Sequence, residues 1–211
     1  MYSLFLNLEE EKRRTIINAA LKEFSTNTYD LASTNKIVKQ AVISKGILFH
    51  YFGSKKNLYL FLNEYVTEIF ADALNTRLNW QEPDIFKRYE QIVEIKFQLM
   101  KQYHNLFDFL KMVYAETSTD VRQELNEYNL TLQKKSYETV FEGIDFTLFK
   151  EHIDVKKAID TIQWVTDGIN QRYDQQLKAH VNDENAFNNL LEQCAAEANS
   201  YFLFLKQLLY K

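Results

Sequence analysis

The sequence predicts an all-α protein in which a small N-terminal three-helix module precedes a larger helical region. Its 211 residues include only 4 Gly and 1 Pro, so few positions favour the tight turns that hairpins and sheets require. Apolar residues also recur at helical spacing through most of the chain, which is the main sequence signal for amphipathic helices. Both observations favour helices from one end of the chain to the other.

The first three predicted helices are closely spaced, and the second and third are short. The first runs from about Leu8 to Thr26, because apolar residues recur there at helical spacing: Ile16, Ile17, Ala20, Leu21 and Phe24. A second helix starts at Ser33 or Thr34, whose hydroxyls can cap it. Ser44 can cap a third helix of about two turns that ends before Gly53. A tight turn between the second and third helices makes this a helix-turn-helix arrangement.

The third predicted helix has two distinct faces. Leu48 and Phe52 lie four residues apart and supply a buried stripe. The opposite face then presents a cation, a gap, an aromatic ring and an imidazole: Lys45, Gly46, Phe49 and His50. Phe49 and His50 could be ordinary core residues, but the buried stripe is already complete without them. We therefore expect this second face to point outward.

Charge is unevenly distributed along the chain. The net charge is −4, which alone argues weakly against a nucleic-acid partner. Residues 1–58 nevertheless carry nine Lys/Arg and five Asp/Glu, a net charge of +4, and the remainder carries −8. No acidic residue falls between Asp30 and Glu64, although five lysines do. A basic window without carboxylates suits contact with phosphates, and it could equally be a solvated positive face.

Longer helices follow the three-helix module. A fourth helix is predicted from Ser54 to about Leu78, and Glu82-Pro83-Asp84 marks a break. Two helices within 85–103 and 106–114 carry apolar residues on most faces, which is typical of buried helices. The last two segments, 154–179 and 183–210, have cleaner apolar stripes and predict two long helices.

Composition excludes several classes of protein and site. The single cysteine, Cys194, cannot form an internal disulfide, and no Cys/His cluster has zinc-ligand spacing, so we expect a cytoplasmic protein without a metal or other cofactor. The apolar stretch 4–6 is too short for a signal peptide, and the run 201–205 stops at Lys206, far short of a membrane span. Membrane insertion is therefore not expected.

The N-terminal residues resemble a known family. The resemblance is carried by Glu11-Lys12-Arg13, Ala19-Ala20-Leu21, Phe24, Tyr29-Asp30, Ser33-Thr34-Asn35-Lys36-Ile37, and the run Ser44-Lys45-Gly46-Ile47-Leu48-Phe49-His50-Tyr51-Phe52-Gly53-Ser54-Lys55. This pattern is similar to the DNA-binding domain of TetR-family regulators and covers about residues 8–58. Beyond residue 58 only length and helicity match. The resemblance implies a DNA-binding domain at 1–58 and an effector-binding and dimerisation domain at 59–211.

The resemblance also implies roles for individual residues. The positions that face bases in the family's recognition helix, with one position in the preceding helix, are occupied here by Asn35, Lys45, Gly46, Ile47, Phe49 and His50. The positions that contact phosphates are occupied by Ser33, Thr34, Ser44, Tyr51 and Lys55. Base contacts choose the sequence, whereas phosphate contacts position the protein. The implied partner is double-stranded DNA with an inverted-repeat operator.

Two positions depart from the family pattern. Val42 stands where the family usually has glycine in the turn between the second and third helices, and a β-branched residue with positive φ would be strained. Either the turn is strained or its geometry differs from the family's. Ile47 replaces a common threonine, and its apolar side chain could contact a thymine methyl.

The resemblance further implies a homodimeric repressor that a small-molecule effector releases from its operator, and the many aromatic residues suggest an apolar or aromatic effector. Candidates for the wall of an effector pocket are Phe97, Met100, Phe107, Tyr114 and Trp164. Candidates for a four-helix dimer interface are Ile169, Ala198, Phe202, Leu205 and Leu209. The first set could instead be simple core packing, and the second could pack only within its own subunit.

Three other functions are alternatives to a ligand-responsive repressor. The chain has no glycine-rich phosphate loop, no paired Glu-x-x-His sites and no convincing Ser/His/Asp order, so an enzyme is not expected. An effector-independent DNA-binding regulator is one alternative, and a helical carrier of lipids or small molecules is another. Neither an enzyme nor a carrier explains the residues in the window 33–55.

Overall fold

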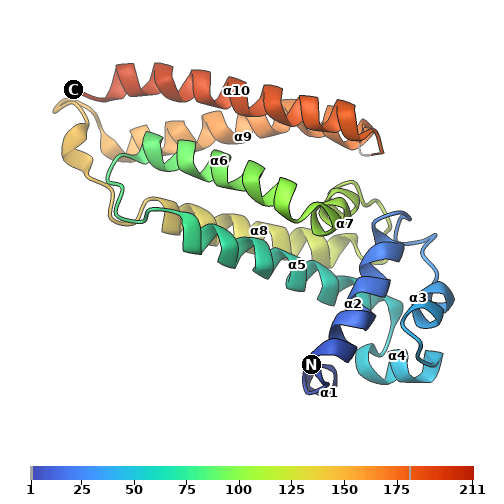
Figure 1. Ribbon diagram of the computed structural model, residues 1–211. Helices are drawn as coiled ribbons and strands as arrows, with labels where there is room; N and C mark the ends of the chain where they lie inside the picture. Colours follow the sequence, from blue (N-terminus) through green and yellow to red (C-terminus); the bar gives the residue numbers. More distant parts are fainter. Residues whose placement is uncertain (1, 181) are drawn as a thin grey trace. The chain divides into compact units, whose positions relative to one another are not determined.

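The computed structural model describes residues 2–180 and 182–211, without the side chains of residues 100, 101, 104, 133 and 137. Over this range the chain is all-α, as the sequence predicts, with one isolated antiparallel bridge between Phe149 and Tyr210. The helices, shown in Figure 1, are α1 (Ser3–Leu6), α2 (Glu10–Phe24), α3 (Thr34–Gln40), α4 (Lys45–Phe52), α5 (Lys55–Arg77), α6 (Ile85–Gln102), α7 (His104–Tyr114), α8 (Arg122–Val140), α9 (Val155–Ala179) and α10 (Glu184–Leu209), with a 3-10 turn at Phe146–Leu148.

Several helix ends are set by side chains that the sequence makes available. Ser44, Asp154 and Asp183 each accept a hydrogen bond from the backbone N–H three residues later, which satisfies an otherwise free amide of the first turn. Ser33 occupies the N-cap of α3, but its hydroxyl makes no capping hydrogen bond. The predicted position of the cap is therefore right, but the predicted hydrogen bond from the Ser33 hydroxyl is wrong.

The helices divide into two compact units. The first unit comprises the chain up to Ala73 together with 99–133, and the second comprises 74–98 together with 134–211. Each unit has its own hydrophobic core built from two separate stretches of the sequence. The functional boundary expected at residue 58 is a different division of the chain, and it stays a prediction.

Aromatic side chains hold the first unit together. Its fully buried residues come from most of its helices: Phe5, Ile16, Ala20, Phe24, Ile37, Tyr59, Leu62, Val66 and Phe109. Phe5 accounts for α1, which the sequence did not predict, because its ring centroid lies 4.7 Å from that of Phe52 and 5.4 Å from that of Phe61. The Tyr59 ring lies 5.6 Å from Phe109 of α7. Burial of these rings fixes α2, α4 and α5 against each other and against α7.

The second unit contains a completely buried arginine. Arg88 donates hydrogen bonds to the backbone carbonyls of Trp80 (3.0 Å), Glu82 (2.5 Å), Val140 (2.9 Å) and Glu142 (2.6 Å). The buried Nε has no hydrogen-bond partner among the described residues. Burial lowers the pKa of Arg88, while the four carbonyls accept hydrogen bonds from its two terminal nitrogens and favour the protonated form. Arg88 thereby ties the segment before α6 to the end of α8.

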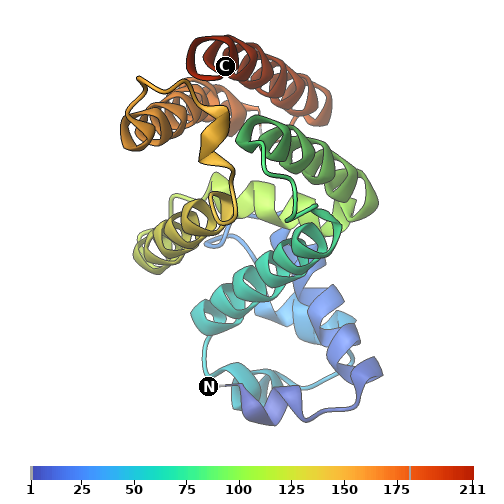
Figure 2. The ribbon, with the colours of Figure 1, turned by 90° about the vertical axis from the view of Figure 1, so that its left-hand side faces the viewer.

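The surroundings of α6 and α10 show which faces of these two helices are buried. Although α6 was expected to be apolar on most faces, it keeps Lys87, Glu90 and Glu94 exposed while Tyr89 is buried, so it is amphipathic. The last helix, α10, runs beside α9 in both views (Figures 1 and 2). The inner face of this pair contributes to the core of the second unit.

Candidate nucleic-acid interface

α4 buries one face and exposes the other. Leu48 and Phe52 are 1% and 3% exposed, so they anchor the helix in the core of the first unit. The predicted base-facing residues are exposed apart from Phe49, which is half-buried: Asn35, Lys45, Gly46, Ile47 and His50 lie at the surface. The structure thus brings one helical face of polar, cationic and apolar groups to the surface, with Asn35 at the start of α3.

The exposed face of α4 has the chemistry to contact base edges. The Lys45 ammonium lies 5.9 Å from the centroid of the Phe49 ring, an arrangement that attracts the cation to the ring. The His50 ring lies 5.8 Å from that of Tyr51. Lysine and neutral or charged imidazole can hydrogen-bond to base edges, and an isoleucine side chain such as Ile47 can contact a thymine methyl. An α-helix also has the right width to enter the major groove.

The turn that carries α4 contains a strained residue. Val42 has a φ of 55°, and no other non-glycine residue in the described part of the chain has positive φ. The backbone N–H of Val42 donates to the carbonyl of Lys39 (3.4 Å), and the N–H of Ile43 donates to that of Val38 (3.1 Å). This pair of bonds is the Schellman arrangement that ends many helices and usually uses glycine. The sequence left two possibilities for this turn, a strained residue or a different geometry, and the structure shows the strained residue.

The predicted phosphate-contacting residues lie at the starts of α3, α4 and α5, except for Tyr51 in the last turn of α4. Four of them are half-buried and one is exposed: Ser33, Thr34, Tyr51 and Lys55, and the exposed Ser44. The backbone N–H of Ser33 donates to Glu23 at 2.9 Å. The Lys55 ammonium donates to the carbonyl of Asp30 at 3.2 Å and lies 4.8 Å from the centroid of the Tyr29 ring. Neither contact neutralises the charge of Lys55.

The connection between α7 and α8 reaches the helix-turn-helix region, which the sequence did not reveal. Glu116 accepts a hydrogen bond from the backbone N–H of Tyr29 at 2.8 Å, and Asp120 accepts one from the Tyr29 hydroxyl. The Ser118 hydroxyl donates to the Asp30 carboxylate at 2.8 Å. Burial and the Asp120 hydrogen bond raise the pKa of Tyr29. These partners are 87 to 91 positions apart, so no local pattern pairs them.

Within residues 2–180 and 182–211, no group of three or more His, Cys, Asp and Glu side chains is placed to hold a metal ion. Among the helices described here, none is long and apolar enough to cross a membrane.

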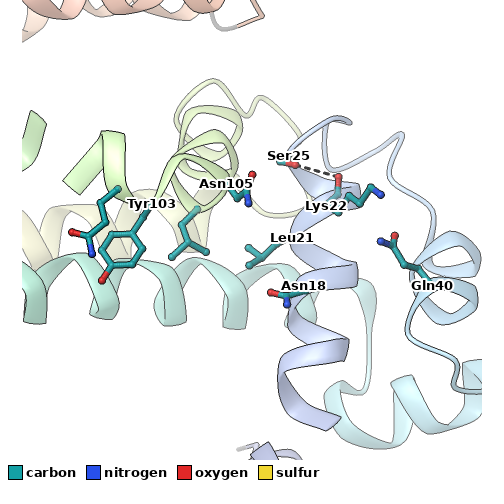
Figure 3. Close-up of a pocket in the computed structure, with 9 residues that line it drawn as sticks. Asn18, Leu21, Lys22, Ser25, Gln40, Tyr103 and Asn105 are labelled. Atoms are coloured by element: carbon teal, nitrogen blue, oxygen red, sulfur yellow. Dashed lines mark hydrogen bonds between the residues drawn. The ribbon is translucent and has the colours of Figure 1, made fainter. Parts of the chain in front are cut away.

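A cleft of about 550 Å³ with a mixed polar and apolar lining lies within the first unit between α2, α3 and the α6–α7 junction (Figure 3). Four of its nine wall residues are amides, and the full wall consists of Asn18, Leu21, Lys22, Ser25, Gln40, Gln102, Tyr103, Asn105 and Leu106. The amide side chains from α2, α3 and α7 are exposed at its rim. No residue of the predicted effector pocket is among these wall residues, so this cleft is not the aromatic pocket that the sequence predicted.

The predicted effector-pocket residues are distributed over both units. Phe97 is half-buried and Trp164 is 70% exposed, both in the second unit. Phe107 is half-buried and Tyr114 is 39% exposed, both in the first. The Met100 side chain lies outside the described residues. A shared pocket for these five residues stays a prediction.

The residues predicted for the dimer interface are buried or half-buried within their own chain. Phe202 and Leu205 are 2% and 6% exposed, and the Phe202 ring stacks on Tyr89 at 4.9 Å in the core of the second unit. Ile169 is also buried, at 4% exposure, while Ala198 and Leu209 are half-buried against that core. Phe202 and Leu205 therefore contribute to the interior of their own chain, and their place in a dimer interface stays a prediction.

Other apolar side chains of α10 are exposed. Tyr201, Leu203, Phe204 and Leu208 are 39%, 56%, 56% and 50% exposed. Tyr201, Phe204 and Leu208 follow the spacing of three and four residues that places side chains on one face of a helix. This outer face of α10 was not selected from the sequence, because apolar residues occupy more than one face of the helix.

Comparisons with known proteins agree with the helix-turn-helix geometry. A family model described as bacterial regulatory proteins, tetR family, matches residues 16–61. The HTH-type transcriptional regulator YuxN of Bacillus subtilis is 31% identical over 134 residues, 60% of this chain and 42% of YuxN, so the chain spans less than half the length of that relative. The fatty acid metabolism regulator protein of the same organism is 25% identical over 158 residues, 70% of this chain and 75% of that protein.

One solved structure is similar to most of this chain in fold. The transcriptional regulator FadR from Bacillus subtilis in complex with stearoyl-CoA has a TM-score of 0.54 and 23% identity, and the alignment covers 86% of this chain and 97% of that one. At this identity the likeness concerns the fold alone. Because it covers 86% of this chain, the likeness extends well beyond the helix-turn-helix.

Proposed function

Because the chain is a TetR-family transcriptional regulator, we propose that it binds an inverted-repeat operator as a homodimer and is released when a small apolar effector binds. The observation that carries the DNA-binding part is the outward face of α4, which presents Lys45, Ile47 and His50 while Leu48 and Phe52 anchor the helix. A buried stripe holds such a helix rigidly, and rigid placement is what base recognition needs.

Within this proposal the exposed side chains divide into two roles. Lys45 and His50 choose the DNA sequence through base edges in the major groove. Lys55 holds the DNA backbone, and the half-buried hydroxyls of Ser33 and Thr34 support it near the start of α3. The net charge of +4 over residues 1–58 favours this approach, because each neutralised phosphate releases condensed counterions.

Sequencing the DNA fragments that the purified protein retains would identify an operator, and three variants would then test the roles. Lys45→Ala or His50→Ala should change the preferred sequence and weaken the operator complex by about 1–3 kcal/mol if a base contact is lost. Lys55→Ala should weaken all DNA alike and lower the slope of log affinity against log salt by about one. Lys178→Ala removes the same charge from an exposed site on α9 and should leave the slope unchanged.

The division of roles would be wrong if all three substitutions in the helix-turn-helix region had the same effect on operator and random DNA. The absence of any salt-dependent binding by the wild-type protein to retained fragments would contradict the proposed function itself.

For the effector we propose an acyl chain carried as a thioester. One relative is named as a fatty acid metabolism regulator, and the FadR structure was solved in complex with stearoyl-CoA. The chain is also rich in apolar side chains, with 16 Phe and 13 Tyr. Stearoyl-CoA is therefore the first compound to test, with coenzyme A alone as the matched control that lacks the acyl chain.

Fluorescence anisotropy of labelled operator would measure release by stearoyl-CoA. Release requires that the ligand bind the DNA-free conformation more tightly, and a tenfold preference corresponds to about 1.4 kcal/mol. By linkage, operator DNA must weaken ligand binding by the same factor. Equal ligand affinity with and without operator would contradict release by this compound and favour a regulator that needs no such effector.

A further inference from the structure

We propose that the connection between α7 and α8, residues 115–121, positions the Lys55 ammonium for a DNA phosphate by fixing Tyr29 and Asp30. The inference rests on the proposed function, because it assigns a role to residues that lie behind a DNA contact. All of these residues belong to the first compact unit. We call residues 115–121 the α7–α8 turn.

The α7–α8 turn holds Tyr29 at both ends. Glu116 accepts the backbone N–H of Tyr29 at 2.8 Å, and Asp120 accepts the phenol hydroxyl. Glu116 is itself fixed, since its other carboxylate oxygen accepts the N–H groups of Thr117 (2.9 Å) and Ser118 (2.8 Å). Tyr29 is 5% exposed, so its ring has little freedom to move while these bonds are intact.

Lys55 touches the two residues that the turn holds. Its ammonium lies 4.8 Å from the centroid of the Tyr29 ring and donates to the Asp30 carbonyl at 3.2 Å. The side chain of Asp30 accepts a hydrogen bond from Ser118 of the same turn at 2.8 Å. Both contacts of the ammonium are therefore tied to the α7–α8 turn, 60 or more positions away in the sequence.

The chemistry of these contacts leaves Lys55 available to DNA. A ring face and a carbonyl orient an ammonium without cancelling its charge. Because the Tyr29 hydroxyl donates to a carboxylate, electron density on the ring rises and the attraction for the cation increases. Holding a flexible lysine in place before binding also lowers the conformational entropy that the complex would otherwise lose.

The neighbouring lysine shows a contrasting arrangement. Lys56 forms an ion pair with Glu124 of α8 at 2.6 Å, which neutralises its charge. The two adjacent lysines at the start of α5 therefore contact different kinds of groups. Lys56 is paired with a carboxylate, while Lys55 is oriented by groups that bear no full charge at the contact.

Two substitutions break the link, and one matched variant controls for charge. Asp120→Ala and Tyr29→Phe should each weaken operator and random DNA about three- to tenfold and reduce the salt slope by up to about one, since one phosphate contact is lost. Glu127→Ala removes an exposed carboxylate from α8, as Asp120→Ala removes one from the turn, without touching Tyr29. Electrostatics alone predicts that both alanine variants bind DNA more tightly, so the opposite signs separate positioning from charge.

A double-mutant cycle with Lys55→Ala tests whether Asp120 acts through Lys55. Asp120→Ala should weaken DNA binding in the wild-type background and have no further effect in the Lys55→Ala background. A general structural defect would weaken binding in both. Asp120→Asn keeps an acceptor for the Tyr29 hydroxyl and should restore most of the affinity lost in Asp120→Ala.

NMR of the protein without DNA tests the positioning of Lys55 independently of any operator. In the wild-type protein the Tyr29 ring current should shift the NMR signals of the Lys55 ε-methylene upfield, and Asp120→Ala should reduce that shift while Glu127→Ala keeps it. An unchanged shift in Asp120→Ala overturns the inference even if the protein binds DNA as proposed. A reduced shift with unchanged DNA affinity and salt slope overturns it as well. If the wild-type protein binds no DNA, the proposed function fails, and the inference falls with it.

Discussion

Val42 follows the last turn of α3, is 88% exposed and adopts a φ of 55°. A β-branched side chain in this conformation crowds the backbone, and a strained residue costs on the order of 1–3 kcal/mol. The two hydrogen bonds of the Schellman arrangement and the burial of Leu48 and Phe52 after the turn compensate for that strain. Because the side chain is almost fully exposed, packing does not require valine here.

We therefore predict that Val42→Gly stabilises the protein. Relief of about 1–3 kcal/mol of strain outweighs the roughly 0.5–1 kcal/mol by which glycine loses additional backbone entropy on folding. The free energy of unfolding should rise by about 1 kcal/mol, measured by urea denaturation followed by circular dichroism.

Gly53 provides the matched control, because it ends α4 with a φ of 75°. Gly53→Ala should destabilise the protein, since alanine there would acquire the strain that Val42 now bears. A lower free energy of unfolding for Val42→Gly would show that the turn does not store strain at this residue.

At the scale of elements, one ion pair joins the start of α6 to the end of α10 within the second unit. The Asp84 carboxylate accepts the backbone N–H of Phe86 at 3.0 Å and the Lys206 ammonium at 2.6 Å. Burial would raise the pKa of Asp84, but the hydrogen bonds from Lys206 and Phe86 outweigh it and hold the pKa below its ordinary value of 3.8. Asp84 therefore stabilises the fold in its ionised form.

This lowered pKa predicts a dependence of stability on pH. The contribution of Asp84 is present above about pH 4 and is lost as the pH falls through its lowered folded value, because protonation removes the favourable contacts. Asp84→Asn should lower the free energy of unfolding near neutral pH, and the difference from wild type should shrink as the pH falls toward about 3.

Urea denaturation at a series of pH values would measure this difference, with Lys206→Met as the companion variant. Removing the ammonium should raise the pKa of Asp84 and so weaken the loss of stability at acid pH. A difference between wild type and Asp84→Asn that stayed constant from neutral to acid pH would rule out this role for the carboxylate.

At the scale of the whole molecule, the outer face of α10 is the surface that we assign to the proposed dimer. Phe204 and Leu208 are 56% and 50% exposed and lie four residues apart on that face. On α9, which runs beside α10, Trp164 is 70% exposed. Apolar side chains of this size favour burial, and a twofold axis along two such helices from each chain would bury them in a four-helix bundle.

Phe204→Glu should therefore yield monomers that keep their helicity but lose tight operator binding. The glutamate would place a charge in the apolar interface, whereas the monomer fold tolerates it because the position is exposed. Multi-angle light scattering at micromolar concentration would measure the mass, and circular dichroism would measure the helicity.

Two further variants serve as controls for Phe204→Glu. Leu130→Glu alters a side chain on α8 that is 65% exposed and should leave the dimer intact. Phe202→Glu should lose helicity rather than dissociate cleanly, since Phe202 is part of the chain's own core. A wild-type monomer that still bound the full operator tightly would refute the proposed dimer.

Local periodicity and capping residues were sufficient to predict the all-α class, the helix-turn-helix and the bounds of the longest helices. The exposed face of α4 was predicted from the same spacing. Leu48 and Phe52 define the buried face of this short helix without reference to the rest of the fold. Val42 was also identified from sequence as the awkward residue of the turn. These features depend on contacts between residues a few positions apart.

The inward face of α10 and the contacts behind Lys55 were decided only by the tertiary structure. Apolar residues occupy more than one face of α10, so burial of Phe202 and exposure of Phe204 depend on which side meets Tyr89. Tyr29 and Asp120 are 91 positions apart, and Arg88 reaches carbonyls 52 and 54 positions away. Sequence spacing specifies neighbours along a helix, whereas pairing between distant segments is selected by the free energy of packing the whole chain.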